Sequence, residues 1–169
     1  MIAIRRATTT DADWLAELYS GDDVDPFLGP RAATRRGPIL EEIERSQREP
    51  GVFGRFVIEA DGERAGAFGF HQESEANAIA RLEGLAVHPA YRGRRIADEA
   101  ARLAQRLLLV ELGYHRVELA CYAFNERAIA HAERSGFVRE GLKRKAYRRH
   151  GEWQDAVLFA LLREDLDGS

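Results

Sequence analysis

Three strand-like runs followed by one long amphipathic helix constrain the fold more than any other part of this sequence. Residues 53–60 and 64–71 are rich in Phe, Val, Ile and Gly, and Asp61-Gly62 between them is typical of a tight hairpin. Residues 78–88 form a third run of this kind. The helix is indicated after it by apolar residues that recur every three or four positions: Ile96, Ala100, Leu103, Leu107 and Val110.

Another strand-like run, residues 115–122, follows that helix, so the helix connects two strands of one sheet. Such a connection is right-handed and places its two strands parallel, whereas the hairpin before it is antiparallel. We therefore expect an α/β (α+β) fold, a mixed and mostly antiparallel sheet of six to seven strands with helices on both faces. The remaining expected elements are a strand at 2–6, a helix through Trp14 and Tyr19, a loop at 21–38, helices at 39–48 and 126–135, and two final strands that contain Phe137 and residues 157–162.

The length and charge of the chain fit one ordinary globular domain spanning residues 1–169. It carries 25 Lys+Arg and 28 Asp+Glu, and this net charge of −3 argues against a dedicated nucleic-acid binder. Cys121 is its one cysteine, which excludes an intramolecular disulfide, and the longest apolar run, 156–162, is far shorter than the ~20 residues of a membrane span. We therefore expect a cytoplasmic protein. We also expect no bound metal, because the histidines lack the spacing of a metal-binding pair.

The segment 87–97 carries the most chemical information. It is expected to contain a strand end, a turn and the first turn of the long helix, and Arg92, Arg94 and Arg95 lie where the helix N-terminus is itself positive. An anion would turn this repulsion into attraction, and Gly93 would let the backbone approach it closely, so the segment suits a pyrophosphate. A solvated basic corner fits the same residues.

Three parts of the chain resemble the GNAT superfamily of acetyl-coenzyme A (acetyl-CoA) dependent N-acetyltransferases. In that family a strand ends in a Val-x-Pro-like turn and leads into Gln/Arg-x-x-Gly-x-Gly/Ala, the frame that residues 92–97 fill here. Residues 125–129 with Gly136-Phe137 are similar to the family's Asn-x-x-Ala-Ile segment, which has Gly-Phe eleven residues after the Asn. Residues 4–12 resemble the family's first strand and helix, and the tail from Gly136 resembles the branch that acetylates ribosomal-protein N-termini.

The resemblance implies a binding site for acetyl-CoA as a co-substrate. The backbone amides of residues 92–97 would hold the pyrophosphate, the backbone of residues 85–87 would meet the pantetheine, and Asn125 would reach the pantetheine arm unless it only caps a helix. The residues expected to bind are Leu85, Ala86, Val87, Arg92, Gly93, Arg94, Arg95, Ile96, Ala97 and Asn125. Arg95 replaces the family's central glycine, so we expect right-handed helical backbone there.

The resemblance also implies direct transfer of the acetyl group to a primary amine in a ternary complex. Glu83 is the candidate base, because a period of two places Glu83, Leu85 and Val87 on one face of the strand, toward the cofactor. A solvent-facing carboxylate paired with Arg81 is the alternative. The Val87 N–H is the candidate donor to the thioester oxygen.

The family's acid for the leaving thiolate is a Tyr seven residues after the Asn, and Ala132 occupies that position here. His131 and Tyr147 are the candidate substitutes, and the thiolate can also leave unprotonated, since a thiol pKa is only about 8.5. The missing Tyr keeps a second interpretation open, a regulatory module that binds CoA without catalysis.

The acceptor and other partners stay open at this point. The basic segment 143–149, expected in a connection between the last two strands with Tyr147 as a stacking ring, would suit a nucleic acid. Asp22, Asp23 and Asp25 either attract a cationic amine or only solvate their loop. The acceptor is a small-molecule amine or a peptide N-terminus, and a homodimer, although common for such folds, is indicated by no residue.

Overall fold

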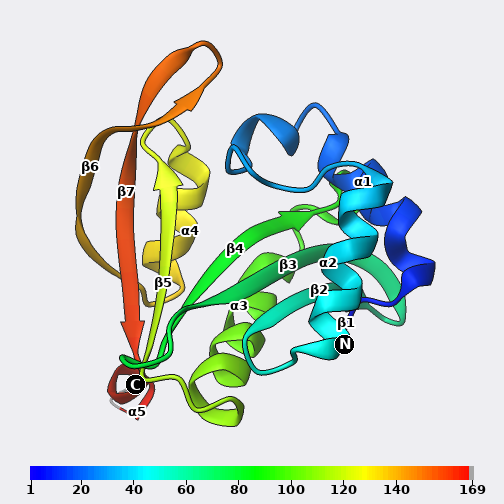
Figure 1. Cartoon of the computed structure of the whole chain (residues 1–169), viewed down its shortest axis with the longest axis horizontal. Coiled ribbons are helices and arrows are strands. Elements are labelled where there is room, and N and C mark those ends of the chain that lie inside the picture. The colour runs from blue at the N-terminus through cyan, green and yellow to red at the C-terminus, as the bar shows by residue number, and fades with distance from the viewer. Residues whose placement is uncertain (168–169) are drawn as a thin grey trace.

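The computed structural model describes residues 1–167 and contains, within that range, one seven-stranded sheet with helices on both faces (Figure 1). The strands are β1 (Ile2–Arg6), β2 (Phe53–Ala60), β3 (Glu63–Ser74), β4 (Ile79–Val87), β5 (Arg116–Tyr122), β6 (Val138–Arg149) and β7 (Glu152–Leu162). Their order across the sheet is β1-β2-β3-β4-β5-β7-β6, and β4 with β5 is the parallel pair among antiparallel ones. The predicted mixed, mostly antiparallel sheet is confirmed.

The helices divide the core into two parts. They are α1 (Ala12–Ser20), α2 (Arg36–Arg48), α3 (Ile96–Arg106), α4 (Glu126–Arg134) and α5 (Arg163–Asp167). The part under α1 and α2 includes Leu15, Ile39, Ile43 and Val57, and the part under α3 and α4 includes Phe68, Phe70, Ala100 and Leu108. Each of these side chains other than Ala100 contributes roughly 1.5–3 kcal/mol on burial. α2 begins at Arg36, earlier than expected, and Pro38 fits its first turn because amides there have no helical acceptor.

Asp11, fully buried just before α1, joins the first strand to the third. Its carboxylate accepts hydrogen bonds from Arg5 Nη1 (2.7 Å), Arg64 Nε (2.8 Å) and the Thr8 N–H (2.8 Å). Burial acts to raise the pKa of Asp11, but these donors outweigh it and lower the pKa to about 2. The acceptor capacity of the buried carboxylate is therefore well used, and the start of α1 is held against the sheet.

The sheet opens between β4 and β5. These strands pair only through residues 79–81 and 116–118, and beyond this point they diverge toward the top of Figure 1. Among the described residues, 82–87 of β4 have no partner strand on the β5 side. The resulting gap exposes one backbone edge of β4 in the middle of the sheet.

The basic segment 143–149 lies in strand β6, so the expectation that it forms a connection is wrong. Strands β6 and β7 run on to a tight turn at His150-Gly151, where both residues have positive φ. Tyr147 packs edge-on against Tyr122 with ring centroids 6.1 Å apart, so it is not a free stacking ring. Arg149 donates to the backbone oxygen of Asp25, which fastens the end of β6 to the loop between α1 and α2.

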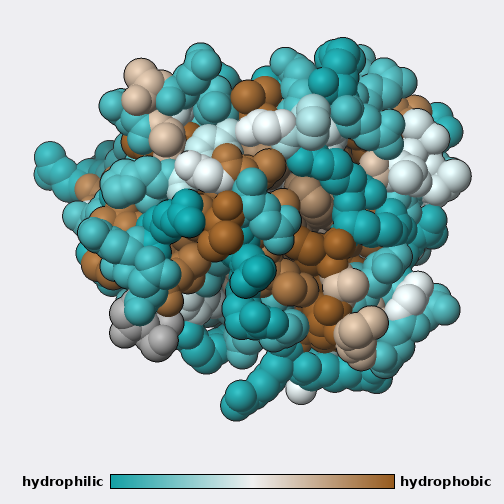
Figure 2. Space-filling model, turned by 90° about the horizontal axis from the view of Figure 1, so that it is seen from below, coloured by the Kyte–Doolittle hydropathy of each residue, from teal (hydrophilic) through white to brown (hydrophobic). Residues whose placement is uncertain are grey.

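Seen from below, the surface is mostly hydrophilic, with apolar side chains gathered toward the middle of that face (Figure 2). None of the helices in the described range is long and apolar enough to span a membrane.

Candidate active site

A bulge at Gly84 sets the geometry of strand β4. Ala67 pairs with Ala86 and Gly69 pairs with Glu83, so β4 contains one residue more than β3 over this stretch. Gly84 has φ +65°, which favours glycine, and the Tyr19 hydroxyl donates to its carbonyl oxygen at 2.8 Å. A side chain in α1 thus holds the irregular point of the strand.

The bulge overturns the expectation that Glu83, Leu85 and Val87 share one face, because the period of two fails where a residue is inserted. Leu85 and Val87 pack against the core under α3. Ala86 lies in the core under α1 and α2, and Glu83, which pairs with Gly69 on the far side of the bulge, interacts with Arg55 on that same side. Strand β4 therefore presents its carboxylate to the α2 side and its apolar side chains to the α3 side.

The backbone of Val87 faces the gap. The His88 N–H donates to the Ala65 oxygen at 2.8 Å, and hydrogen-bonded positions alternate along an antiparallel pair. The N–H and C=O of Ala86 consequently face β3, which removes Ala86 from the backbone groups expected to meet the pantetheine. Those of Val87 point the other way, and its oxygen accepts from Arg92 Nε at 3.2 Å.

The turn before α3 departs from the right-handed backbone expected at Arg95. Arg95 is left-handed, with φ 57° and ψ 22°, and Gly93 has φ +81°. The expectation is wrong because the chain must reverse sharply before α3 begins at Ile96, and a left-handed residue makes that turn. For a residue other than glycine this conformation costs roughly 1–2 kcal/mol.

All three arginines in this turn interact with other protein groups, Arg95 through the effect of its charge on Asp98. Arg92 binds Asp23 (Nη1–Oδ2 2.7 Å), and the guanidinium of Arg94 stacks on the Tyr91 ring at 5.4 Å. The Arg95 oxygen already accepts from the Glu99 N–H, as the first bond of α3. The three preceding amides, those of residues 96–98, have no acceptor inside the helix and are suited to bind a pyrophosphate.

Asn125 caps α4. Its Oδ1 accepts from the Ala128 N–H at 3.2 Å, as the alternative interpretation of this residue predicted. The cap uses the oxygen alone, so the side-chain NH₂ group is available to a ligand.

The two substitutes for the missing acid lie in different surroundings. His131 Nε2 is 3.3 Å from Asp98 Oδ1, and burial lowers the pKa of His131. It links α4 to the first turn of α3. Tyr147 is engaged with Tyr122, and Ala132 is buried in the core.

Arg55 is a buried charged residue on this side of the sheet that sequence reasoning missed. Its side chain is 7% exposed, its Nε donates to Glu42 Oε2 at 2.7 Å, and its guanidinium lies 5.1 Å from the centre of the Tyr19 ring. It belongs to one cross-strand row with Gly69 and Glu83. A side chain at Gly69 would meet Arg55 Nη1 at 3.1 Å, so the glycine provides the space that the arginine fills.

The neighbouring row places His71 beside Glu83. His71 Nδ1 lies 3.4 Å from Glu83 Oε1, and His71 Nε2 lies 3.0 Å from Glu73 Oε2. Arg81, the expected alternative partner of Glu83, lies 3.8 Å from Glu73, and its charge also acts to lower the pKa of Glu83. Partial burial acts to raise the pKa of Glu83, but the hydrogen bond and charge of His71 outweigh it, and together with the charge of Arg55 they lower that pKa.

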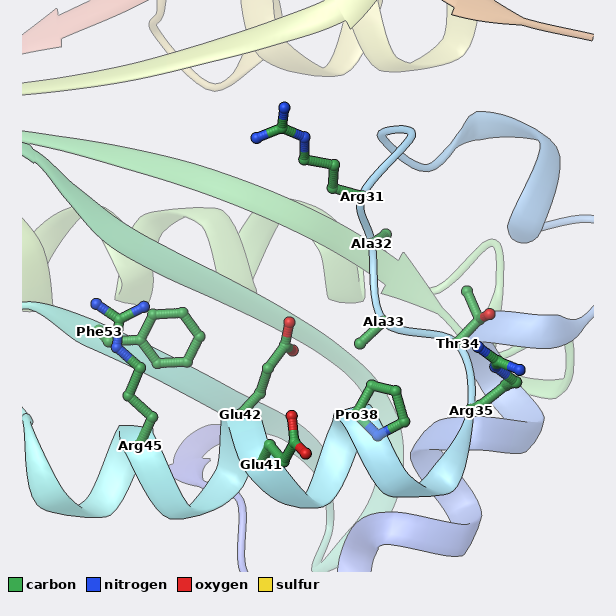
Figure 3. Close-up of a pocket in the computed structure, with 10 residues that line it drawn as sticks. All are labelled: Arg31, Ala32, Ala33, Thr34, Arg35, Pro38, Glu41, Glu42, Arg45 and Phe53. Atoms are coloured by element: carbon green, nitrogen blue, oxygen red, sulfur yellow. The ribbon is translucent and has the colours of Figure 1, made fainter.

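A pocket of about 450 Å³ opens on the same side of the sheet, between α2 and the loop of residues 31–35. Figure 3 shows Glu41, Glu42 and Arg45 extending from α2, and Arg31 on the loop opposite, with its side chain directed away from α2. Glu42 and Phe53 line it and connect it to the two rows, through the Arg55 ion pair and through pairing with His71. The pocket therefore lies on the same side of the sheet as Glu83, although its lining residues do not include Glu83.

The acids expected to attract a cationic amine are mostly neutralised. Asp23 pairs with Arg92, and Asp25 pairs with Arg149 at 3.3 Å. Over residues 1–167, no three side chains of the kind that bind metals come together.

A family model described as the acetyltransferase (GNAT) family matches residues 15–137. The chain is 29% identical over 145 residues to an SPbeta prophage-derived uncharacterized N-acetyltransferase of Bacillus subtilis (strain 168), covering 86% of this chain and 79% of that protein. It is 28% identical over 107 residues to the spermidine N(1)-acetyltransferase of Escherichia coli (strain K12), covering 63% and 57%. The crystal structure of a spermidine N-acetyltransferase from Vibrio cholerae in complex with CoA and spermine has the same fold, with a TM-score of 0.83 at 20% identity over 97% of this chain and 96% of that one. Since the family model covers well over half of the sequence, this protein belongs to the acetyltransferase (GNAT) family of acetyl-CoA-dependent enzymes.

Proposed function

We propose that this chain, as one domain spanning residues 1–169, transfers the acetyl group of acetyl-CoA to a small primary amine by direct attack, with Glu83 receiving the proton of the amine. The observation that carries the proposal is the bulge at Gly84. It turns the Glu83 carboxylate toward the pocket side, while the Val87 N–H, four positions along the strand, faces the gap. Strand β4 would then contact both substrates, the acceptor amine through the Glu83 side chain and the acetyl donor through the Val87 backbone.

The residues of the gap fit acetyl-CoA, which supplies the thioester carbonyl when bound. The amides of residues 96–98 would hold its pyrophosphate, the side-chain NH₂ of Asn125 would donate to the pantetheine arm, and the Val87 N–H would donate to the thioester oxygen. Gly93 and Arg95 shape the turn that aims these amides. Ala86 contributes packing, because its backbone is paired with β3.

The pocket supports a small-molecule amine over a peptide N-terminus. Its volume of about 450 Å³ falls in the range of roughly 300–1,000 Å³ that small-molecule sites occupy. A regulatory module without catalysis would not require an accessible carboxylate on strand β4, and Glu83, on the same side of the sheet as the pocket, is 46% exposed.

The test compares Glu83→Gln with Glu75→Gln, an exposed control on the turn after β3. With acetyl-CoA and a panel of primary amines, Glu83→Gln should lower kcat by about 10²- to 10³-fold, because a positioned base contributes about that much. Its Kd for acetyl-CoA, measured by calorimetry, should match the wild type. Wild-type turnover in Glu83→Gln would remove Glu83 as the base, and absence of acetyl-CoA binding by the wild type would overturn the whole proposal.

A further inference from the structure

Glu83 is the first member of a chain of titratable side chains that leads to solvent. His71 Nδ1 faces Glu83 Oε1 at 3.4 Å, and His71 Nε2 faces Glu73 Oε2 at 3.0 Å. His71 is 33% exposed and Glu73 is 44% exposed. The three side chains thus form one connected group on this side of the sheet, with Glu83 at one end and Glu73 at the other.

Both ring nitrogens of His71 face carboxylate oxygens, which only accept, so neutral His71, with one N–H, can donate to only one of them at a time. The contact of Nε2 with Glu73 is the shorter one, and the tautomer with its hydrogen on Nε2 is the one that can receive a proton at Nδ1. Nδ1 then presents a lone pair to the carboxylate of Glu83, and two acceptors face each other across 3.4 Å. A single proton placed between them converts this unfavourable contact into a charge-assisted hydrogen bond.

The pKa values of Glu83 and His71 indicate which of the two holds the proton of the amine. The pKa of Glu83 is lowered, which makes the carboxylate alone a weak base near neutral pH. The hydrogen bond with Glu83 raises the pKa of His71 against the effect of burial, and Glu73 adds to the rise. A base works best when its pKa lies near the working pH, and His71 meets that condition better than Glu83. The charged groups that face His71 are Glu83, Glu73 and Arg81, with Arg55 acting on it through Glu83.

We propose that Glu83 and His71 act as one base and that the acceptor's proton comes to rest on His71, an inference that depends on the proposed function. The N–H bond of the acceptor ammonium breaks, its electron pair stays on nitrogen for the attack, and its proton passes through the Glu83 carboxylate to His71 Nδ1. The imidazolium then gives its Nε2 proton to Glu73 or water, and exchange with water moves the remaining ring hydrogen from Nδ1 to Nε2, which restores the starting tautomer. His71 is a positioning residue, because it acts through Glu83.

The experiment is the pH dependence of kcat/KM in His71→Gln, with His115→Gln as an exposed histidine control. In the wild type kcat/KM should fall as the pH drops below the raised pKa of His71, because His71 then already holds a proton. His71→Gln should lose this inflection, lower kcat roughly tenfold or more, keep its KM for acetyl-CoA, and regain part of its rate with added imidazole. A variant that retains the wild-type inflection overturns the proposal.

Glu73→Gln tests the same inference without touching the histidine. It removes an anion that raises the pKa of His71, so the inflection should move to lower pH. An inflection that stays in place in this variant would count against the relay even if His71→Gln failed to fold.

The two proposals fail in different ways. Wild-type activity in Glu83→Gln sinks the proposed base, whereas an impaired Glu83→Gln beside an unchanged pH profile in His71→Gln sinks the relay alone.

Discussion

The two sides of strand β4 offer a ligand different kinds of groups, backbone groups on one side and side chains on the other. Toward α3 and the gap, the groups available to a ligand belong to the backbone, namely the Val87 N–H and the first amides of α3. Toward α2 they are side chains, and Glu83, His71 and Arg55 come from three different strands. The first set is contiguous in sequence, and the second exists only once the strands are paired.

This difference implies different tolerance to substitution. A site made of amides depends on φ and ψ, so a change of side chain alters it in small steps, as Arg95 in a glycine position illustrates. A site made of interlocked charges depends on each partner being present, so removing one leaves others buried and unpaired. We therefore expect large effects on the α2 side and small effects on the α3 side.

The largest effect on stability is expected for Arg55→Met. The substitution removes a buried guanidinium and leaves Glu42 without its partner, so the free energy of unfolding should fall by about 3 kcal/mol, the lower end for a broken buried pair because Glu42 is 27% exposed. Arg45→Met is the matched control. Arg45 lies on α2 near the same pocket and pairs with Glu49 at the surface, a contact worth about 1 kcal/mol at most. Equal losses in urea unfolding for the two variants would break the comparison.

A smaller effect is expected at Asn125. Asn125→Ala should cost about 1 kcal/mol through loss of the cap, and Asn125→Ser should restore most of this because serine supplies a cap oxygen. Both variants lack the side-chain NH₂, so both should raise the Kd for acetyl-CoA by up to about tenfold, the value of one hydrogen bond. Calorimetry alongside thermal unfolding separates the two roles. If Asn125→Ser bound acetyl-CoA like the wild type, the residue would be a cap and nothing more.

The smallest effect is expected at Arg95. Arg95→Gly relieves roughly 1–2 kcal/mol of left-handed strain and costs roughly 0.5–1 kcal/mol in chain flexibility, so the protein should gain at most about 1.5 kcal/mol. Arg95→Ala keeps the strain and removes the charge, and it should gain nothing. Affinity for acetyl-CoA should change less than threefold in both, because the turn binds through amides. A larger drop shared by both variants would show that the guanidinium itself holds the ligand.

Local patterns predicted the sheet and its connections because apolar periodicity and turn residues act within a few positions of the chain. They missed α5, in which Leu166 is the one apolar residue. Local patterns also failed to predict the backbone at Gly84 and Arg95, where contacts between distant parts of the chain set the conformation, such as the hydrogen bond from Tyr19 to Gly84. A strict period of two placed Glu83 on the wrong face for this reason.

The acceptor side was less accessible to sequence reasoning. Arg55 stands between a glycine and a phenylalanine in a strand, and no local rule distinguishes it from a surface arginine. His71 and Glu83 are twelve residues apart, and the pairing register that brings them together includes an insertion. The cofactor side was predictable because its groups lie in one short segment with a recognisable frame.

The short pairing between β4 and β5 gives this sheet four edges instead of two. The two additional edges belong to β4 and β5 and border the gap between these strands. The arm of acetyl-CoA that would enter there is long, thin and rich in amide groups, much like an extended peptide. Binding the donor would then complete the secondary structure of the protein, so that the filled enzyme is a more continuous and stiffer sheet than the empty one. Release of CoA after transfer would break the hydrogen bonds between CoA and the strand backbone, and the free energy of release would depend on how many of these bonds CoA makes.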